Sequence, residues 1–303
     1  MKLLSRMMKS LERRVDQAAP LHKSLLHSLL VMAWTVEARD PYTGGHLWRV
    51  SRYARLLAEQ SGLSEEDTAR IAIGGFLHDL GKIAIPDHIL NKKDRLTQEE
   101  YETIKTHPEI GWRVISGHPL AALAEAGILY HHERPDGTGY PRGLRSAAIP
   151  EDARIIGICD AFDAMTSTRP YRKGMSKEDA LSAIEQNQGK QFDHALSNHF
   201  LAVADTGKLD HIIGHSDEGI PLRNCVVCGP TLVFKRHQQA NDYVYCRSCA
   251  AEYRTEACNG DLVATPTGKR GQPWQLQPEL DTTTIDALIQ QSLPALSELS
   301  IAR

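Results

Sequence analysis

The chain has 303 residues, a formal net charge of -3 at pH 7 and an isoelectric point near 6.5. This length exceeds one small domain and allows a substantial core with an appendage. The balanced charge gives no reason to expect a long nucleic-acid or membrane partner. No run approaches about 18 consecutive apolar residues, which excludes a membrane span, and residues 1–9 lack the pattern of a signal peptide, so we expect a cytoplasmic protein.

Helical periodicity dominates the first two thirds of the sequence. Over residues 21–38 the apolar residues recur on one broad helical face, and Asp40 with Pro41 ends that helix. A second helix is expected over residues 45–60. The leucines and methionines of residues 1–35 are typical of a packing segment or of a homodimer contact.

Capping residues predict the helices that follow. Ser64 opens a helix that carries His78 and Asp79 and ends at Gly81, and Thr97 opens one whose last turn carries His107. Further helices are expected from Pro119 to His132, from Pro150 through Asp160 and Asp163, from Ser176, and from Asp193 to about Val203. The histidines named here lie at helix ends, and helix ends converge in a bundle.

The sequence changes character after residue 219. No strand-like alternation precedes residue 220, whereas residues 222–254 are rich in Val, Phe, Tyr and Thr, as in a small ribbon of strands. Residues 259–280 have no periodicity and predict a linker or flexible loop. A final amphipathic helix, broken at Pro294, follows. The predicted fold is mainly α: a helical bundle, a small β module and a C-terminal helix.

Four of the six cysteines form two Cys-x2-Cys pairs with 17 residues between them. This spacing is typical of a zinc ribbon, in which each pair forms a knuckle and Gly229 supplies a tight turn. A redox pair or a disulfide is the alternative. Four thiolates leave no open position on the ion, so we expect one structural zinc and a module that docks a protein partner rather than one that performs chemistry. The ligands would be Cys225, Cys228, Cys246 and Cys249.

Imidazole and carboxylate side chains gather in five short motifs of the helical region. Neutral imidazole is the commonest metal ligand, and imidazoles mixed with carboxylates suit a site that holds more than one transition-metal ion. For the adjacent pair His131 and His132, an ordinary histidine pair beside a Gly/Pro turn is the alternative. The candidate ligands are His46, His78, Asp79, His107, His131, His132 and Asp160.

These motifs resemble, in their order along the chain, those of the HD-GYP phosphodiesterases of the HD superfamily, over roughly residues 36–203. They read Asp-Pro-Tyr-Thr-Gly-Gly-His, His-Asp-Leu-Gly-Lys, Thr-His-Pro-Glu-Ile-Gly, His-His-Glu-Arg-Pro-Asp-Gly-Thr-Gly-Tyr-Pro and Asp-Ala-Phe-Asp-Ala-Met-Thr-Ser-Thr-Arg-Pro-Tyr-Arg. The resemblance implies hydrolysis of cyclic di-GMP to linear pGpG and on to GMP. It implies two divalent ions, iron or manganese, on the seven candidate ligands, with Asp79 bridging them.

The resemblance and the cysteine spacing together suggest how the chain divides, and two alternatives to the cyclic di-GMP phosphodiesterase stay open. A phosphodiesterase for another cyclic dinucleotide is one alternative. A non-catalytic nucleotide-sensing adaptor that docks partners through the ribbon is the other. The expected parts are an N-terminal helical segment (1–35), a phosphohydrolase domain (36–208), a zinc-ribbon-like module (220–256), and a linker with a C-terminal helix (257–303).

Several side chains near these motifs suit a phosphoester substrate. Lys82 could hold a phosphate oxygen or stabilise charge as the ester breaks, a solvated surface lysine being the alternative. Asp163 could orient the attacking water or assist the leaving oxygen, or it could be the hydrogen-bond partner of a ligand histidine. The candidate substrate-binding residues are Lys82, Gly137, Gly139, Tyr140, Arg169 and Arg172, of which the arginines match phosphate and Tyr140 could stack on guanine.

One departure from part of the family concerns Tyr42. Some members have glutamate four residues before the first ligand histidine, where it helps to hold a third ion. Tyrosine is a poor ligand for a divalent ion at neutral pH, so we expect two ions here and cleavage mainly to the linear dinucleotide.

Overall fold

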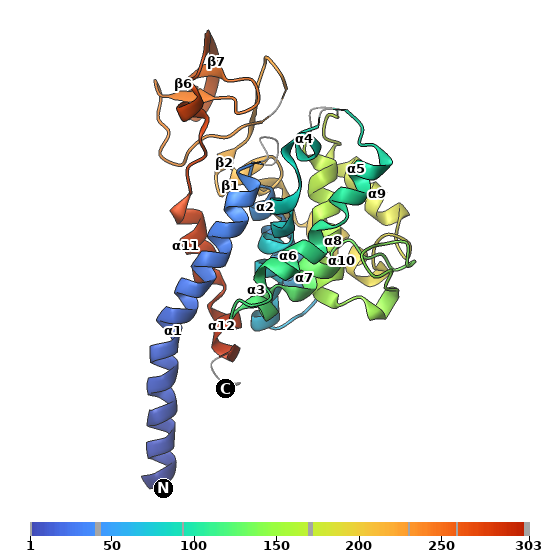
Figure 1. Ribbon diagram of the computed structural model, residues 1–303, viewed down its shortest axis with the longest axis vertical. Helices are drawn as coiled ribbons and strands as arrows, with labels where there is room; N and C mark the ends of the chain where they lie inside the picture. Colours follow the sequence, from blue (N-terminus) through green and yellow to red (C-terminus); the bar gives the residue numbers. More distant parts are fainter. Residues whose placement is uncertain are drawn as a thin grey trace.

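The computed structural model describes residues 2–39, 44–92, 94–168, 172–229, 231–258 and 260–299. Figure 1 shows a body of packed helices, a small β module above it, and the long helix α1 along one side. The prediction of a mainly α fold with a small β module is confirmed. The α-helices are α1 (Lys2–Glu37), α2 (His46–Gln60), α3 (Glu65–Leu77), α4 (Asp87–Leu90), α5 (Gln98–Ile104), α6 (His107–Ile115), α7 (Glu125–Tyr130), α8 (Glu151–Thr166), α9 (Lys177–Gln186), α10 (His194–Asp205), α11 (Thr282–Gln291) and α12 (Leu293–Leu299).

Side-chain caps fix the starts of several helices as predicted. The Ser64 hydroxyl accepts a hydrogen bond from the backbone N–H of Asp67 at 3.1 Å where α3 begins. Thr97 begins α5 with a reciprocal capping box, and the side chains of Ser176 and Asp193 accept backbone hydrogen bonds at the starts of α9 and α10. The short 3-10 helices are η1 (Leu80–Ala84), η2 (Ala121–Leu123), η3 (Ser146–Ala148), η4 (Lys208–His211) and η5 (Pro273–Leu276).

Two predicted helix ends are wrong. His107 is the first residue of α6 and does not lie in the last turn of α5, because Pro108 takes an early helical position, where the missing N–H has no intrahelical partner to lose. Helix α3 ends at Leu77, four residues before Gly81, which lies in η1. Both changes leave the histidines at helix ends. The helix start predicted at Pro119 is also wrong, since α7 begins at Glu125, after the short 3-10 helix η2.

The main core holds α2 and α3 against α8 and α10. Tyr53, Phe162 and Phe200 pack edge to face, with ring centroids 5.3 Å apart for the first two and 5.0 Å apart for the last two. All three are fully buried. Helices α2 and α3 approach so closely that a Cβ on Gly75 would lie 3.2 Å from Cα of Ser51. This contact holds the start of α2 beside the end of α3.

The β module is built from short antiparallel pairs and one three-stranded sheet. Strand β1 pairs with β2, β3 pairs with β4, and the sheet has the order β5-β6-β7. The prediction that no strand precedes residue 220 is wrong, because the short strand β1 lies before it. The strands are β1 (His215–Asp217), β2 (Ile220–Pro221), β3 (Arg223–Asn224), β4 (Thr231–Leu232), β5 (Tyr243–Tyr245), β6 (Ala251–Cys258) and β7 (Asp261–Arg270).

The predicted linker at residues 259–280 contains β7, so that prediction is wrong over Asp261–Arg270. Strand β7 pairs with β6 from Cys258 opposite Asp261 to Ala251 opposite Arg270. It is an edge strand, where Pro266 and a glycine are tolerated because one side of the strand needs no hydrogen-bond partner. Because proline and glycine do not indicate a strand, the sequence did not predict β7.

The C-terminal helices return to the helical body. Ile285 and Leu288 of α11 and Leu296 of α12 belong to the same buried core as Leu26 of α1, and Figure 1 shows α11 and α12 beside α1. The break between the two helices lies at Ser292, whereas Pro294 is the second residue of α12.

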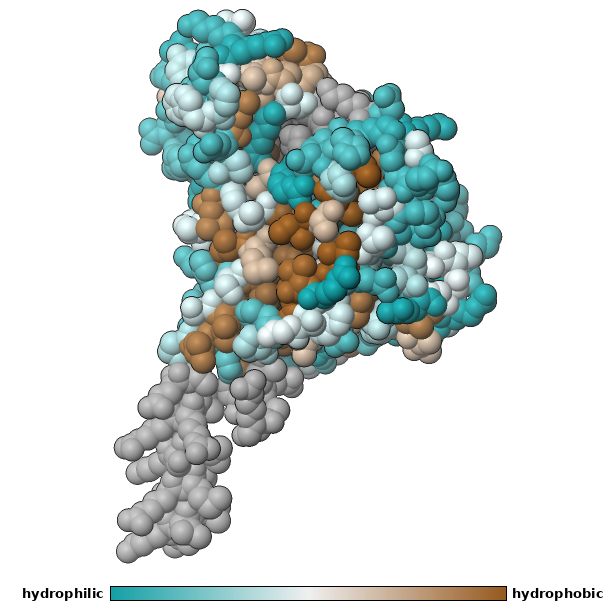
Figure 2. Space-filling view, in the orientation of Figure 1, coloured by the Kyte–Doolittle hydropathy of each residue, from teal (hydrophilic) through white to brown (hydrophobic). Residues whose placement is uncertain are grey.

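Part of the helical body presents apolar side chains to solvent. Figure 2 shows apolar residues gathered on the middle of one face, while the β module above is mostly hydrophilic. Leu21 and Met32 of α1 and Val114 of α6 are among the exposed large apolar residues. A homodimer contact through α1 stays a prediction. Among the described helices, none combines the length and the apolar content needed to cross a membrane.

Candidate metal centre

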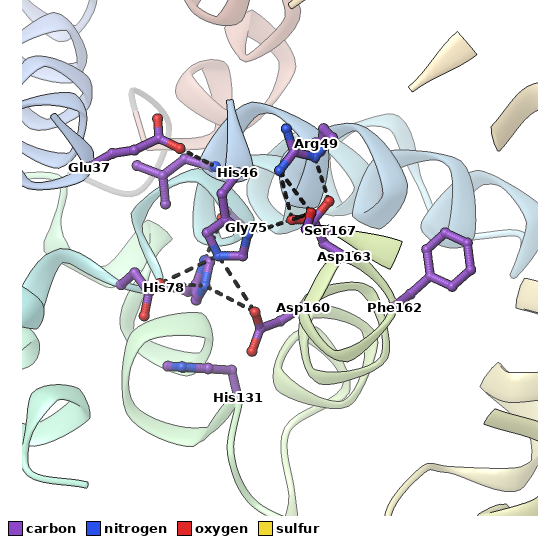
Figure 3. Close-up of polar contacts among 12 residues, drawn as sticks. Glu37, His46, Arg49, Gly75, His78, His131, Asp160, Phe162, Asp163 and Ser167 are labelled. Atoms are coloured by element: carbon purple, nitrogen blue, oxygen red, sulfur yellow. Dashed lines mark hydrogen bonds and ion pairs between the residues drawn. The ribbon is translucent and has the colours of Figure 1, made fainter. Parts of the chain in front are cut away.

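The side chains predicted as metal ligands come from distant segments and meet in one place. Figure 3 shows His46, His78, His131 and Asp160 pointing toward one another from four helical elements. All five histidines and Asp79 lie at or just beyond a helix end, and Asp160 lies within α8. They are His46 at the start of α2, His78 and Asp79 after α3, His107 at the start of α6, His131 and His132 after α7, and Asp160.

Asp79 lies between two groups of imidazoles. Its Oδ2 atom is 3.4 Å from Nε2 of His46 and 3.4 Å from Nε2 of His78. Its other oxygen, Oδ1, is 3.4 Å from Nε2 of His107. Two atoms that bind one ion at about 2.1 Å lie roughly 3 Å apart, so these spacings are close to those of a ligand shell. Asp160 joins the first group, with Oδ1 3.5 Å from Nε2 of His46.

The second group consists of the remaining imidazoles. The Nε2 atoms of His107 and His131 are 3.2 Å apart, and the ligand atoms of His107, His131 and His132 all lie within 4.8 Å of one another. The ligand atoms of His46, His78 and Asp79 meet the same limit. The ligand atoms of His78, His131 and Asp160 also meet this limit, so the two groups are contiguous and together offer enough donors for more than one cation.

Hydrogen bonds fix how the imidazoles point. Nδ1 of His78 donates to the carbonyl of Gly75 at 2.7 Å, and Nδ1 of His131 donates to the carbonyl of Gly127 at 2.7 Å. His107 does the same toward a backbone carbonyl of α5. With Nδ1 holding the proton, Nε2 presents its lone pair to the centre. Nε2 of His78 is buried and has no hydrogen-bond partner among the described residues, as expected of an atom that binds a cation.

Asp163 lies behind His46 and not between the two groups. Its Oδ2 accepts from Nδ1 of His46 at 2.8 Å, and its Oδ1 accepts from Nε of Arg49 at 2.5 Å, with all three side chains buried. This geometry favours the alternative in which Asp163 is the partner of a ligand histidine. Figure 3 shows the contact, together with Ser167.

Arg49 and Glu37 were missed by sequence reasoning. The guanidinium of Arg49 also donates to the carbonyls of Gly44 at 2.8 Å and His215 at 2.7 Å. A carboxylate oxygen of Glu37 accepts from the backbone N–H of Leu47 at 3.1 Å and so caps the first turn of α2 from outside. The signal for Arg49 was its position three residues after His46, on the same helical face.

Burial lowers the pKa of the imidazoles, whereas neighbouring carboxylates raise it. Burial lowers the pKa of His107 to about 4 and that of His132 to about 3, so both are neutral and ready to bind a cation. Burial opposes protonation of His46 as well, but its hydrogen bonds to Asp163 and Asp79 outweigh burial and raise its pKa to about 9. A cation that binds here would therefore replace a proton on His46.

Some of the candidate substrate-binding residues lie beside this centre and others do not. Nζ of Lys82 forms an ion pair with Oδ2 of Asp79, and the ring of Tyr140 lies 4.7 Å from the ring of His132. The guanidinium of Arg172 donates to the carbonyl of Ala164 in α8. Lys82 and Tyr140 are thus beside the centre, and Arg172 is engaged with the backbone of a helix that helps to form it. Arg169 and Tyr42 lie outside the described residues.

The loop after His132 is organised by a residue that the sequence did not reveal as functional. The carboxylate of Glu133 accepts from the backbone N–H of Arg142 at 2.6 Å and of Leu144 at 2.9 Å. A Cβ on Gly139 would lie 2.5 Å from Cα of Glu133, so the loop can close against this backbone only with a glycine at position 139. Gly137 adopts φ 78°, which also suits a turn.

The four paired cysteines of the β module lie together as predicted. The Sγ atoms of neighbouring cysteines are 3.5 to 3.6 Å apart, which is too long for a disulfide and suits thiolates around one ion. Gly229 (φ 84°) and Ala250 (φ 60°) form the left-handed turn after each knuckle. The buried hydroxyl of Tyr253 donates to Sγ of Cys225 at 3.0 Å, a contact that stabilises a thiolate.

Comparison with known proteins identifies the family of the chain. The HD domain family matches residues 31–196, which is more than half of the chain. These residues include every predicted ligand of the helical centre. The chain belongs to the HD domain family, and the resemblance predicted from its motifs is confirmed.

Several relatives of the chain have names that state a substrate. A cyclic di-GMP phosphodiesterase response regulator, RpfG, of Xanthomonas campestris is 44% identical over 54% of this chain and 43% of its own length. A cyclic di-GMP phosphodiesterase of Thermotoga maritima is 38% identical over 67% of this chain and 56% of its own length. A 3'3'-cGAMP-specific phosphodiesterase of Vibrio cholerae is 38% identical over 50% of this chain and 33% of its own length. The chain thus spans about half or less of these relatives.

Proposed function

We propose that the chain is a metal-dependent phosphodiesterase that hydrolyses cyclic di-GMP. The observation that carries the proposal is the pair of ligand groups that share Asp79, with Lys82 and Tyr140 beside them. The names of the relatives support the substrate class. Two divalent ions, which we take to be iron or manganese, would be held by the seven predicted ligands and would supply a hydroxide nucleophile at neutral pH and polarise the phosphate.

The protein's own residues would then bind and orient the phosphoester. Lys82 would neutralise a phosphate oxygen as charge develops, after exchanging its ion pair with Asp79 for one with substrate. Tyr140 would stack on a base, because one side of its ring faces His132 and the ring belongs to the loop closed by Glu133. Asp163 would hold the Nδ1 proton of His46 and keep that imidazole aimed at the centre.

Product and metal analysis tests the proposal directly. The purified protein, loaded with iron or with manganese, is incubated with cyclic di-GMP and, separately, with 3'3'-cGAMP, and the products are separated by chromatography. We expect linear pGpG as the main product and faster turnover of cyclic di-GMP. Faster turnover of 3'3'-cGAMP would favour the alternative suggested by the Vibrio relatives. Binding without turnover under both metals would indicate a nucleotide-sensing adaptor.

Replacing Lys82 by alanine should retain the metal and slow turnover by about 10 to 1000-fold, the loss expected for one charge-stabilising donor. The measurements are metal content and kcat for cyclic di-GMP. Lys177, which pairs with Asp210 on the surface, provides the control Lys177→Ala, with unchanged kcat. Unchanged turnover in Lys82→Ala would exclude a role of Lys82 in hydrolysis, and loss of metal would mean that its ion pair supports Asp79.

Replacing Cys225 and Cys228 together by serine should release about one zinc per chain and unfold the β module locally, because structural zinc supplies much of the folding free energy of such modules. Zinc content and protease sensitivity of residues 220–270 measure this, and Cys258→Ser, at an exposed cysteine outside the cluster, is the control. Hydrolysis should survive in large part. Its complete loss with an intact helical metal centre would show that the β module completes the active site.

A further inference from the structure

A cavity of about 720 Å³ lies between the helical body and the β module. The end of α1 and the start of α2 form one wall, with Trp34, Glu37 and Trp48. The β module forms the opposite wall, where Arg247 lies, and the segment that contains Trp274 forms the rim. The volume is within the range of sites that hold a molecule of nucleotide size. The metal centre does not account for this cavity.

Tryptophan is concentrated around the cavity. The chain has four tryptophans, and three of them, Trp34, Trp48 and Trp274, line this space. Trp274 is 70% exposed, which is unusual for so large an aromatic side chain. The fourth, Trp112, packs against the main core. Indole faces that border a cavity suit a planar aromatic ring.

The charges that line the cavity leave one cation for a ligand. Lys235 pairs with Glu279, and Arg236 pairs with Asp217 and with Asp281. The remaining cation, which is Arg247, has no hydrogen-bond or ion-pair partner among the residues that the structure describes. Burial lowers the pKa of this guanidinium. A half-buried guanidinium without a partner is stabilised when an anion binds, and its planar donors match a phosphate.

The acidic neighbour of Arg247 does not oppose an anion strongly. Glu37 is the charged group that interacts with Arg247 across the cavity. The carboxylate of Glu37 already accepts a hydrogen bond from the backbone N–H of Leu47 at the start of α2, which partly compensates its negative charge. A phosphate at Arg247 and an aromatic ring at the tryptophans would satisfy both parts of the site.

We propose that this cavity binds a purine nucleotide as an effector, with the base against Trp34 and Trp274 and the phosphate at Arg247. A two-ring base covers an indole face well, and the cavity leaves room for the sugar. The effector role rests on the proposed hydrolytic function, whereas the binding itself does not.

The wall of the cavity explains how an occupant would affect hydrolysis. Gly44 and Gly45 line it and lead directly into His46. A Cβ on Gly45 would lie 2.3 Å from the carbonyl oxygen of Ser216, and a Cβ on Gly44 would lie 2.4 Å from Cγ2 of Val233. The β module therefore packs directly on the loop that carries a candidate metal ligand, and a ligand that shifts the module must shift this loop.

Titration of the full chain with GMP, and separately with AMP, tests the binding. Calorimetry gives the affinity, and quenching of tryptophan fluorescence reports the site. We expect saturable binding with quenching, at least about tenfold weaker in Arg247→Ala because a charge-assisted hydrogen bond is lost. Trp274→Ala, at an exposed position that puts the fold at little risk, should also weaken binding. Trp112→Phe is the control and should bind like the unaltered chain.

Three results would overturn the proposal. The first is no saturable binding of either nucleotide, and the second is equal affinity in the unaltered chain and in Trp274→Ala. The third is binding that is lost in Asp160→Ala but kept in Arg247→Ala, which would assign GMP to the metal centre. For the effector role, GMP should change the initial rate of cyclic di-GMP hydrolysis at least about twofold in the unaltered chain and not in Trp274→Ala. An unchanged rate despite binding would overturn that role alone. Because binding is measured without hydrolysis, a failure of the proposed enzyme activity would remain distinguishable.

Discussion

Replacing His78 or Asp79 by alanine is expected to release the metal of the helical centre and to abolish hydrolysis of cyclic di-GMP. Nε2 of His78 is fully buried without a hydrogen-bond partner among the described residues, and Asp79 faces imidazoles on both sides. Loss of a residue that only supports a ligand costs about 10 to 100-fold, so loss of a ligand should cost more. Elemental analysis and product chromatography measure the two effects, and circular dichroism should show that the helical content is kept.

An exposed histidine of the same chain gives the matched control for this experiment. His194 begins α10 on the surface, away from the ligand groups, so His194→Ala should retain both metal and turnover. Full metal occupancy in both His78→Ala and Asp79→Ala would rule out the ligand assignment. Loss of metal from His78→Ala alone would mean that the ions bind independently of the shared carboxylate, and loss from Asp79→Ala alone would mean that His78 is not needed as a ligand.

Replacing Gly81 by alanine should destabilise the fold by about 3 kcal/mol or more, a large part of the stability of a typical domain. An added Cβ would lie 1.8 Å from the carbonyl oxygen of His107 and 2.5 Å from the backbone nitrogen of Gly111. Both obstacles are backbone atoms, so no side-chain rotation can relieve them. The start of α6, and His107 with it, must move, and metal should be lost as well.

Gly117 provides the control for this substitution, because a Cβ there would meet no heavy atom within 4 Å. Gly117→Ala should stay within about 1 kcal/mol of the unaltered chain. Chemical denaturation gives the two free energies of unfolding, and metal content gives the effect on the centre. Equal stability of Gly81→Ala and Gly117→Ala would show that η1 and α6 are not packed as the structure has them.

Sequence alone predicted the helices whose starts carry a chemical signal. Ser64, Thr97 and Asp193 each provide an oxygen that accepts a backbone hydrogen bond, and each begins a helix in the structure. Helix ends were harder to predict. Pro108 is compatible with the start of a helix and with its end, so the sequence could not decide on which side of it the helix lies.

The ligand groups could be predicted by residue type, whereas their support could not. The imidazoles and carboxylates that carry the chemistry are rare enough to stand out in the sequence. Arg49, Glu37 and Glu133 act through hydrogen bonds to residues that are remote in sequence or to the backbone, and a charged residue in a helix is usually solvated. Strand β7 was missed for a related reason, since an edge strand needs little apolar alternation.

The return of α11 and α12 to α1 affects how the chain can fold during its synthesis. Leu26 and Leu296 share one core although 269 residues separate them in the sequence. The nascent helical body cannot close its core until the whole β module has left the ribosome, so α1 and α3 expose apolar surface during that time. The module is then tethered at both ends to the same body, by α10 before it and α11 after it, and cannot swing away as a domain at the end of a chain would.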